Sequence, residues 1–168
     1  LYKVMAPGIR MYPGVRLKGL SRLSSTLIAG ANDVVLVNTV ATTLANGFDI
    51  QDLGFSAGGF SGVTGVFLDG EDASKRFSLI QMKDLYFNCN TGLRLRFCAN
   101  VLLQSCFANT CHDGFILDNV ADGVLHDCHA QNGSGYGFLV QGGEGPSDEG
   151  IKLTNCTTNG QAYGISVI

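Results

Sequence analysis

Gly114-Phe-Ile-Leu117 is the clearest element of a repeat, and it returns as Gly137-Phe-Leu-Val140 and Gly164-Ile-Ser-Val167. Each copy begins eight or nine residues after a cysteine, and the three cysteines are Cys106, Cys128 and Cys156. The repeated unit is therefore about 22 to 28 residues long. Repeats of this length are typical of solenoids, propellers and arrays, in which each unit buries its apolar face only against its neighbours.

The same register extends toward the N-terminus. The positions aligned with the cysteines are Leu53, Leu85, Cys106, Cys128 and Cys156, and the aligned glycines are Gly65, Gly92, Gly114, Gly137 and Gly164. The first and third residues after each glycine are apolar, as in Phe115 and Leu117. Alternation with a period of two places these side chains on the inner face of a strand. No stretch keeps apolar residues three and four positions apart for three turns, so we predict strands rather than helices.

A short polar residue directly precedes each of the positions that align with the cysteines. This row, called the bend row below, consists of Asp52, Asp84, Ser105, Asp127 and Asn155. Such side chains cap their own backbone, and Asp and Asn tolerate a left-handed conformation, as a sharp bend between two strands requires. Stacked Asn and Asp residues also stabilise in-register β structure. We therefore interpret Asp52, Asp84 and Asp127 as bend residues and omit them from the catalytic candidates.

Composition limits the classes of function. The 168 residues suffice for one domain with a core, and 45% apolar residues with only 15% charged residues argue against disorder. A net charge of -3 without a basic stripe excludes nucleic acid as an expected partner. No apolar run approaches the roughly 18 residues of a membrane span, so no membrane insertion is expected. The repeat pattern is cut off at both ends of the sequence, so we expect residues 1–168 to be one domain from a longer chain.

The six cysteines are predicted to be reduced. Three of them recur at one repeat position, where a free buried cysteine is a suitable small apolar residue. Stacked neighbours at this position are close enough for a disulfide to remain the alternative. No Cys-x-x-Cys motif or Cys/His spacing indicates a metal site, and no cofactor is predicted.

A segment near the N-terminus resembles a known superfamily. The matching residues are Gly14, Val15, Leu17, Gly19, Arg22, Ser25, Thr26 and Ile28. They are similar to the first coils of the pectate-lyase-like superfamily, although the second glycine usual after Gly19 is replaced. The resemblance implies a single-stranded right-handed parallel β-helix, here of about six to seven coils, and parallel connections also prefer this hand. Many phage tailspikes and polysaccharide-degrading enzymes use this fold.

Outward positions carry the function of a solenoid, because its core serves packing. Three rings directly after the bend row belong to adjacent coils, which lie about 4.8 Å apart, so they are expected to form an aromatic strip. Such a strip suits the apolar faces of sugar rings, and polar side chains directly before the bend would supply hydrogen bonds. The predicted substrate-binding residues are Tyr86, Phe107 and His129 in the strip and Lys83, Gln104 and His126 before the bend. A subunit contact or ordinary surface is an equally good interpretation.

Two long insertions, residues 69–76 and 141–150, carry the best pool of carboxylates for acid/base chemistry. The catalytic candidates are Glu71, Asp72, Glu144, Asp148 and Glu149, with Asp113 added because it follows His112 in another loop. Solvated loop charge is the alternative for each of them. The insertions lack the regular alternation of oxygen ligands that would indicate a calcium site.

The strand that follows each glycine has two further outward rows. The first contains Phe67, Arg94, Ile116, Leu139 and Ser166, and it predicts an exposed apolar surface that contacts a partner. The second places Arg96 between Asp69 and Asp118, so we predict an ion-pair ladder. An arginine at this position keeps both carboxylates ionised, which disfavours the protonated general acid that an inverting glycosidase needs.

The resemblance implies a phage tailspike-like domain in the virion tail that binds host capsule or lipopolysaccharide as a homotrimer. Whether it also cleaves this polysaccharide, as a glycoside hydrolase or a polysaccharide lyase, is left open. One alternative is a secreted, extracellular bacterial lyase or hydrolase, but the Arg-rich catalytic motif of pectate lyases has no counterpart here. The other alternative is a non-catalytic shaft domain whose outer faces serve only the packing of a trimer.

Overall fold

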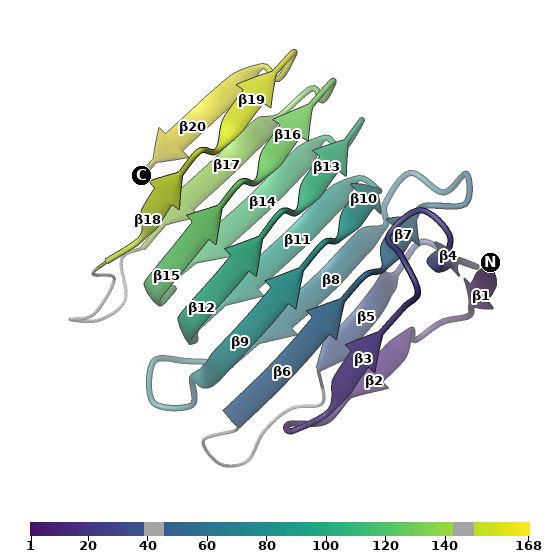
Figure 1. Cartoon of the computed structure of the whole chain (residues 1–168), viewed down its shortest axis with the longest axis horizontal. Coiled ribbons are helices and arrows are strands. Elements are labelled where there is room, and N and C mark those ends of the chain that lie inside the picture. Colours follow the sequence, from purple (N-terminus) through teal and green to yellow (C-terminus); the bar gives the residue numbers. More distant parts are fainter. Residues whose placement is uncertain (39–45, 143–149) are drawn as a thin grey trace.

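The computed structural model describes residues 1–38, 46–142 and 150–168. These residues form twenty short strands and no helix (Figure 1). No described segment is therefore a helix with the length and apolar character needed to cross a bilayer. The strands stack side by side into one solenoid, and the two termini lie at opposite ends of the stack (Figure 1).

Three parallel sheets make up the solenoid. Sheet A contains β1 (Tyr2–Val4), β4 (Thr26–Ala29), β7 (Gly54–Ser56), β10 (Tyr86–Asn88), β13 (Phe107–Asn109), β16 (His129–Gln131) and β19 (Thr157–Asn159). Sheet B contains β2 (Ile9–Met11), β5 (Val34–Asn38), β8 (Thr64–Asp69), β11 (Thr91–Arg96), β14 (Asp113–Asp118), β17 (Tyr136–Gln141) and β20 (Tyr163–Val167). Sheet C contains β3 (Arg16–Lys18), β6 (Asn46–Gln51), β9 (Phe77–Lys83), β12 (Cys98–Gln104), β15 (Ala121–His126) and β18 (Lys152–Thr154).

The chain visits the sheets in the fixed order B, C, A, and each strand pairs with its counterpart one coil later. The predicted single-stranded parallel β-helix of six to seven coils is thereby confirmed. The predicted inward residues after the glycines are buried or partly buried from β8 to β17, whereas Ile165 and Val167 in the last strand, β20, are 52% and 76% exposed. Aromatic rings stack along the axis between coils. The stacked pairs are Phe55–Phe87, at 5.3 Å between ring centroids, and Phe115–Phe138, at 5.0 Å. The core is one column of such contacts inside the three sheets.

The repeated glycines mark a corner where successive coils come too close for any side chain. A Cβ atom on Gly92 would lie 2.6 Å from the carbonyl oxygen of Gly114, and a Cβ atom on Gly114 would lie 2.6 Å from that of Gly137. Real Cβ atoms essentially never approach a heavy atom so closely. The glycine repeat is therefore a steric requirement of coil stacking at this corner.

The bend row has the left-handed backbone that the sequence predicts. The φ angles are 57° for Asp52, 51° for Asp84, 53° for Ser105, 52° for Asp127 and 53° for Asn155. The backbone N–H groups of Asp52, Asp84, Ser105 and Asp127 donate to the next coil; for example, Asp84 N donates to Gln104 O at 3.0 Å. The interpretation of these aspartates as bend residues is confirmed, because their backbone conformation explains the residue type.

All six cysteines are free thiols, and five of them are fully buried. Cys106 and Cys128 occupy the same inner corner of consecutive coils, and Cys156 follows them in a partly exposed position. A side-chain contact with Cys106 and burial raise the pKa of the Cys128 thiol well above its ordinary value. Cys128 therefore acts as a small neutral core residue.

The predicted exposed apolar row on sheet B is only partly correct. Strand pairing aligns Phe67, Arg94, Ile116, Leu139 and Ser166 on the outer face, as expected. Ile116 and Leu139 are nevertheless buried, at 9% and 7% exposure, and the Arg94 guanidinium lies over the Phe67 ring at 5.6 Å. Side chains of one parallel row are about 4.8 Å apart, so large neighbours shield one another without a partner chain. The row is no evidence for a trimer.

Candidate functional site

Three rings lie in register on the outer face of sheet A. Strand pairing aligns Tyr86 of β10 with Phe107 of β13, and Phe107 with His129 of β16. The ring centroids are 5.7 Å apart for Tyr86–Phe107 and 6.3 Å apart for Phe107–His129, and all three side chains are partly exposed. This group, called the ring strip below, forms a continuous surface that crosses three coils, as the sequence predicts.

A second row lies on the other side of the bend. Lys83, Gln104 and His126 align at the C-terminal ends of β9, β12 and β15 in sheet C. Each precedes its ring by three residues, with a bend residue between the two. This polar row offers an ammonium group, an amide and an imidazole beside the rings, so the predicted geometry of all six residues is confirmed.

Amide side chains border the ring strip on its far side. Asn109 donates to the Tyr86 hydroxyl at 2.9 Å, and Gln131 donates to Asn109 Oδ1 at 3.2 Å. Both follow their ring by two residues on a strand, so period-two alternation puts them on the same outer face. Sequence reasoning did not select these two residues, although this alternation was available. The rings are thus enclosed between two rows of hydrogen-bonding groups.

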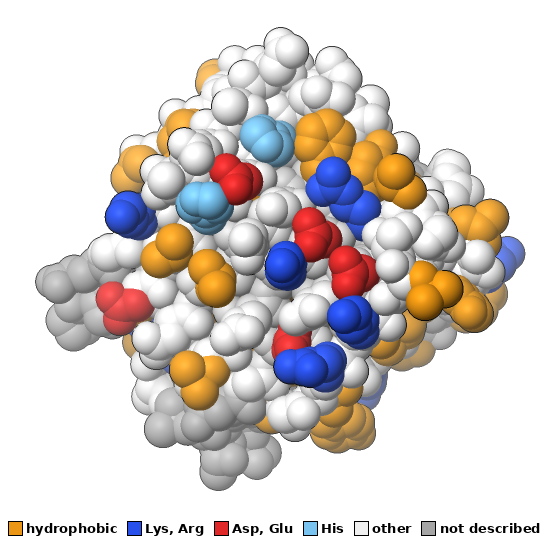
Figure 2. Space-filling view, viewed as in Figure 1, with side chains coloured by type: hydrophobic (Ala, Val, Ile, Leu, Met, Phe, Trp, Pro, Cys, Tyr) orange, Lys and Arg blue, Asp and Glu red, His pale blue; other side chains and the backbone are white. Residues whose placement is uncertain are grey.

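Further contacts fix the side chains around the ring strip. His126 Nδ1 lies 2.8 Å from the Asp127 carboxylate, and His129 Nδ1 lies 2.6 Å from the Thr157 hydroxyl. Arg22, from the loop between β3 and β4, donates to the carbonyl oxygen of Ser105 in the bend row at 2.9 Å. This arginine reaches a residue 83 positions away and brings a cation to the site. The face of the molecule in Figure 2 carries scattered charges of both signs among uncharged groups.

Glu71 and Asp72 lie far from the ring strip, in the loop between β8 and β9. This loop precedes β9, whereas the strip follows β9, so the seven residues of the strand separate them by about 23 Å (Figure 1). Glu71 pairs with Lys75 at 2.8 Å. Hydrogen bonds from Ser74, at 2.7 Å from its hydroxyl and 2.8 Å from its backbone, lower the pKa of Asp72. A carboxylate held ionised in this way is poorly suited to act as a general acid.

The His112-Asp113 pair does not form a dyad. Asp113 Oδ1 accepts a hydrogen bond from the backbone N–H of Tyr136 at 2.9 Å, and His112 Nδ1 lies 2.8 Å from the Ser134 hydroxyl. Both side chains thus contact the next coil instead of each other. The remaining catalytic candidates, Glu144, Asp148 and Glu149, lie outside the described residues.

The residues of the predicted Asp-Arg-Asp ladder align on neighbouring strands as expected, but their hydrogen-bond partners differ from the prediction. Arg96 pairs with Asp69 through both Nε, at 2.8 Å, and Nη2, and this contact raises the pKa of Arg96. Asp118 instead accepts from Arg94 Nη2 at 3.1 Å and from Asn119 at 2.9 Å. Arg96 thus lies between the two aspartates as predicted, but its hydrogen bonds go to Asp69, and Asp118 takes Arg94 as its hydrogen-bond partner. Arg94 and Arg96 lie two residues apart on one face, so each can reach a different coil.

One family matches most of the chain. The model described as "Right handed beta helix region" covers residues 25–168. The chain belongs to the right-handed β-helix family. This membership gives the hand of the solenoid and is compatible with polysaccharide binding, polysaccharide processing or a structural role. No curated protein and no solved structure matches the chain significantly. Within the described ranges, no cluster of three or more His, Cys, Asp or Glu side chains could hold a metal ion.

Proposed function

We propose that this β-helix domain binds a host cell-surface polysaccharide, capsule or lipopolysaccharide, through the ring strip. The observation that carries the proposal is the alignment of Tyr86, Phe107 and His129 between two rows of polar side chains. Aromatic faces pack against the C–H faces of sugar rings, and nearby amides both donate to and accept from hydroxyl groups. A surface of this kind follows a linear glycan over several coils.

The geometry supports binding more directly than cleavage. The described insertion carboxylates, Glu71 and Asp72, are a strand length away from the rings and are paired locally. Asp84 and Asp127 lie beside the ring strip, but their left-handed backbone conformation already explains why aspartate occurs at these positions. We therefore assign no catalytic step, and a domain that holds polysaccharide is the function we propose.

The tailspike context of the proposal comes from the resemblance of the first coils. Phage tailspikes with this fold present polysaccharide sites on a homotrimer in the virion tail, and we extend this arrangement to the present chain. Measurement of mass in solution tests the trimer directly. If the rings serve a subunit contact instead, Phe107→Ala lowers the oligomer mass, and the structural-shaft alternative is favoured.

Binding is tested with fragments of bacterial capsule and lipopolysaccharide displayed on a glycan array, followed by calorimetry on the fragments retained. Phe107→Ala is expected to weaken binding about tenfold at constant oligomer mass, since the loss of one central aromatic contact typically costs more than 1 kcal/mol. Tyr163→Ala is the matched control, because Tyr163 stacks on Tyr136 at 4.9 Å in sheet B, away from the strip. Equal affinity of Phe107→Ala and the unmodified chain would contradict the proposal. Release of reducing ends during incubation would show cleavage as well.

A further inference from the structure

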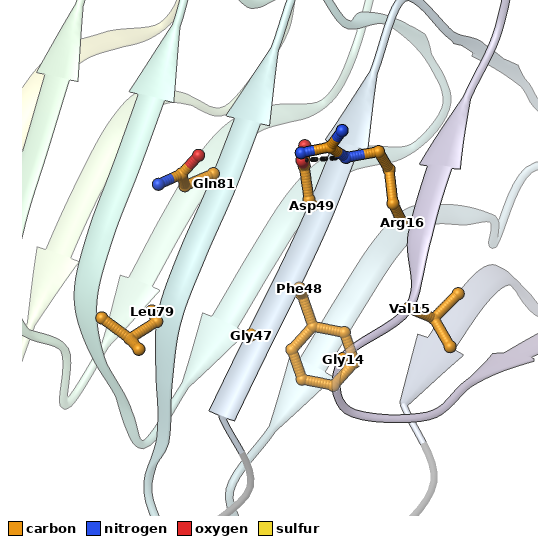
Figure 3. Close-up of a pocket in the computed structure, with 8 residues that line it drawn as sticks. All are labelled: Gly14, Val15, Arg16, Gly47, Phe48, Asp49, Leu79 and Gln81. Carbon is orange, nitrogen blue, oxygen red and sulfur yellow. Dashed lines mark hydrogen bonds and ion pairs between the residues drawn. The ribbon is translucent and has the colours of Figure 1, made fainter.

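A groove of about 470 Å³ lies on the outer face of sheet C, between β3 and β9 (Figure 3). Two glycines make room for it. A Cβ atom on Gly14 would meet no atom within 4 Å, and one on Gly47 would meet only the backbone of Gly14, at 3.8 Å. Side chains at these positions would occupy the open space, so the groove exists because both residues are glycine. This N-terminal groove is separate from the ring strip.

The lining of the N-terminal groove combines apolar and polar groups. Val15 and Leu79 lie on opposite sides of β6 (Figure 3) and are 42% and 57% exposed. Arg16 Nε and the Asp49 carboxylate form an ion pair at 2.5 Å, and Gln81 lies beside them. The groove therefore presents methyl groups, an acceptor and several donors within one small volume.

Leu79 is the unusual residue of this groove. Four consecutive coils have a left-handed residue at the same place in sheet C, with φ angles of 87° for Gly47, 58° for Leu79, 51° for Asn100 and 54° for Asp122. Glycine, asparagine and aspartate tolerate this conformation, whereas leucine does not adopt it readily. The Leu79 side chain is also exposed, so burial within the chain does not offset the strain. Strain at an exposed apolar residue supports a role in contacting a ligand.

We propose that the N-terminal groove binds one neutral pyranose ring of the polysaccharide that contacts the ring strip, an inference that rests on the proposed function. The C–H face of the sugar packs between Val15 and Leu79. Its hydroxyl groups donate to Asp49 and accept from Arg16, while the Gln81 amide can do both. The ion pair carries no net charge, which favours a neutral sugar over an acidic one. The volume lies in the range of small-ligand sites.

Strand β9 connects the groove to the ring strip. Gln81 and Lys83 project outward from it and are exposed, so polar side chains line the path from Leu79 to Tyr86. Seven residues of extended chain span at most about 23 Å. One sugar ring cannot contact both places, whereas an oligosaccharide of several sugars can. The bound glycan therefore runs along β9 and then turns onto the rings.

The test compares short and long fragments of the capsule or lipopolysaccharide that the unmodified chain retains. Leu79→Asn places the residue of the neighbouring coil at this position and removes the apolar wall. It is expected to weaken binding of long fragments about tenfold, the scale of one lost contact of moderate strength, and to leave mono- and disaccharide binding at the ring strip unchanged. Gln81→Ala, which leaves the left-handed residue in place, is a second variant with the same expected selectivity for long fragments.

Leu102→Asn is the matched control, because Leu102 is an equally apolar side chain on sheet C, 40% exposed and outside the groove. The groove assignment is overturned if both Leu79→Asn and Gln81→Ala bind long fragments as the unmodified chain does while Phe107→Ala weakens them. Failure of the unmodified chain to bind any fragment overturns the proposed function and this inference together. Loss of short-fragment binding in Leu79→Asn also contradicts the inference, because short fragments would then bind in the groove and not at the ring strip.

Discussion

The carbonyl oxygen of Gly137 lies 2.6 Å from the position that a Cβ atom on Gly114 would occupy. This contact joins two coils at the corner between sheets A and B, and backbone atoms cannot move aside as the end of a flexible side chain can. The repeat of glycine at this corner is therefore the feature of the sequence most directly tied to the spacing of the coils.

Gly114→Ala is expected to lower the free energy of unfolding by about 2–3 kcal/mol, because the added methyl group forces two coils apart in a packed interior. Chemical denaturation followed by circular dichroism measures this difference. Gly62→Ala is the control, since the nearest atom to its added Cβ is 3.8 Å away and belongs to the Asn32 side chain. Equal stability of the two variants would contradict the steric explanation of the glycine row.

Asp84 tests the interpretation of the bend row. Its φ of 51° is compatible with asparagine, which occupies the same position in a later coil as Asn155. Asp84→Asn should therefore keep both stability and polysaccharide binding, whereas Asp84→Val should cost about 1–2 kcal/mol, because a β-branched residue is strained in this conformation. Thermal unfolding and calorimetry on both variants provide the measurement. A loss of polysaccharide binding in Asp84→Asn with stability retained would contradict the purely structural role of this aspartate.

Buried thiols make the stability depend on alkaline pH. Burial raises the pKa of Cys111 from 9.0 to about 11, since the thiolate is disfavoured in the core. The unfolded chain loses this proton near pH 9, while the folded chain keeps it until about pH 11. The contribution is therefore complete below pH 9 and is lost as the pH rises toward 11, by about 3 kcal/mol for a shift of two units.

Urea denaturation at pH 8 and pH 10.5 measures this loss, and Cys111→Ala is expected to show a smaller difference between the two pH values. Burial raises the pKa of the Cys89 and Cys98 thiols as well, so part of the alkaline loss remains in the variant. Equal pH dependence in the two proteins would show that Cys111 does not contribute.

The fold and the ring strip follow from the sequence because an in-register solenoid converts sequence spacing directly into spatial neighbours. Once Cys106 and Cys128 are aligned, Phe107 and His129 must be adjacent, and strand pairing confirms it. Core packing keeps every coil in this register, so residues at equivalent repeat positions are neighbours throughout the solenoid. The inner face, the bend row and both rows of the candidate site are therefore predictable from one alignment.

The alignment of repeat positions does not determine which side chains pair in ion pairs and hydrogen bonds. Arg94 and Arg96 each have carboxylates within reach on neighbouring coils, and the choice of Asp118 by Arg94 depends on rotamers and packing. Burial of Ile116 likewise depends on the size of its neighbours on the outer face. The N-terminal groove was not predicted, because the first coils lack the Cys and Gly positions that align the later ones. The contact of Arg22 with Ser105 joins two parts of the chain that no local pattern connects.

A reciprocal exchange tests whether Leu79 is kept in a strained conformation. Leu79→Asn is expected to raise the free energy of unfolding by about 1 kcal/mol, because asparagine tolerates the left-handed backbone and little apolar burial is lost. Asn100→Leu, the reverse exchange at the aligned position of the next coil, should lower the free energy of unfolding by a similar amount of about 1 kcal/mol. Urea denaturation of both variants and of the unmodified chain gives the comparison. If Leu79→Asn is instead less stable, the leucine contributes to packing, and its strain no longer supports a ligand at the groove.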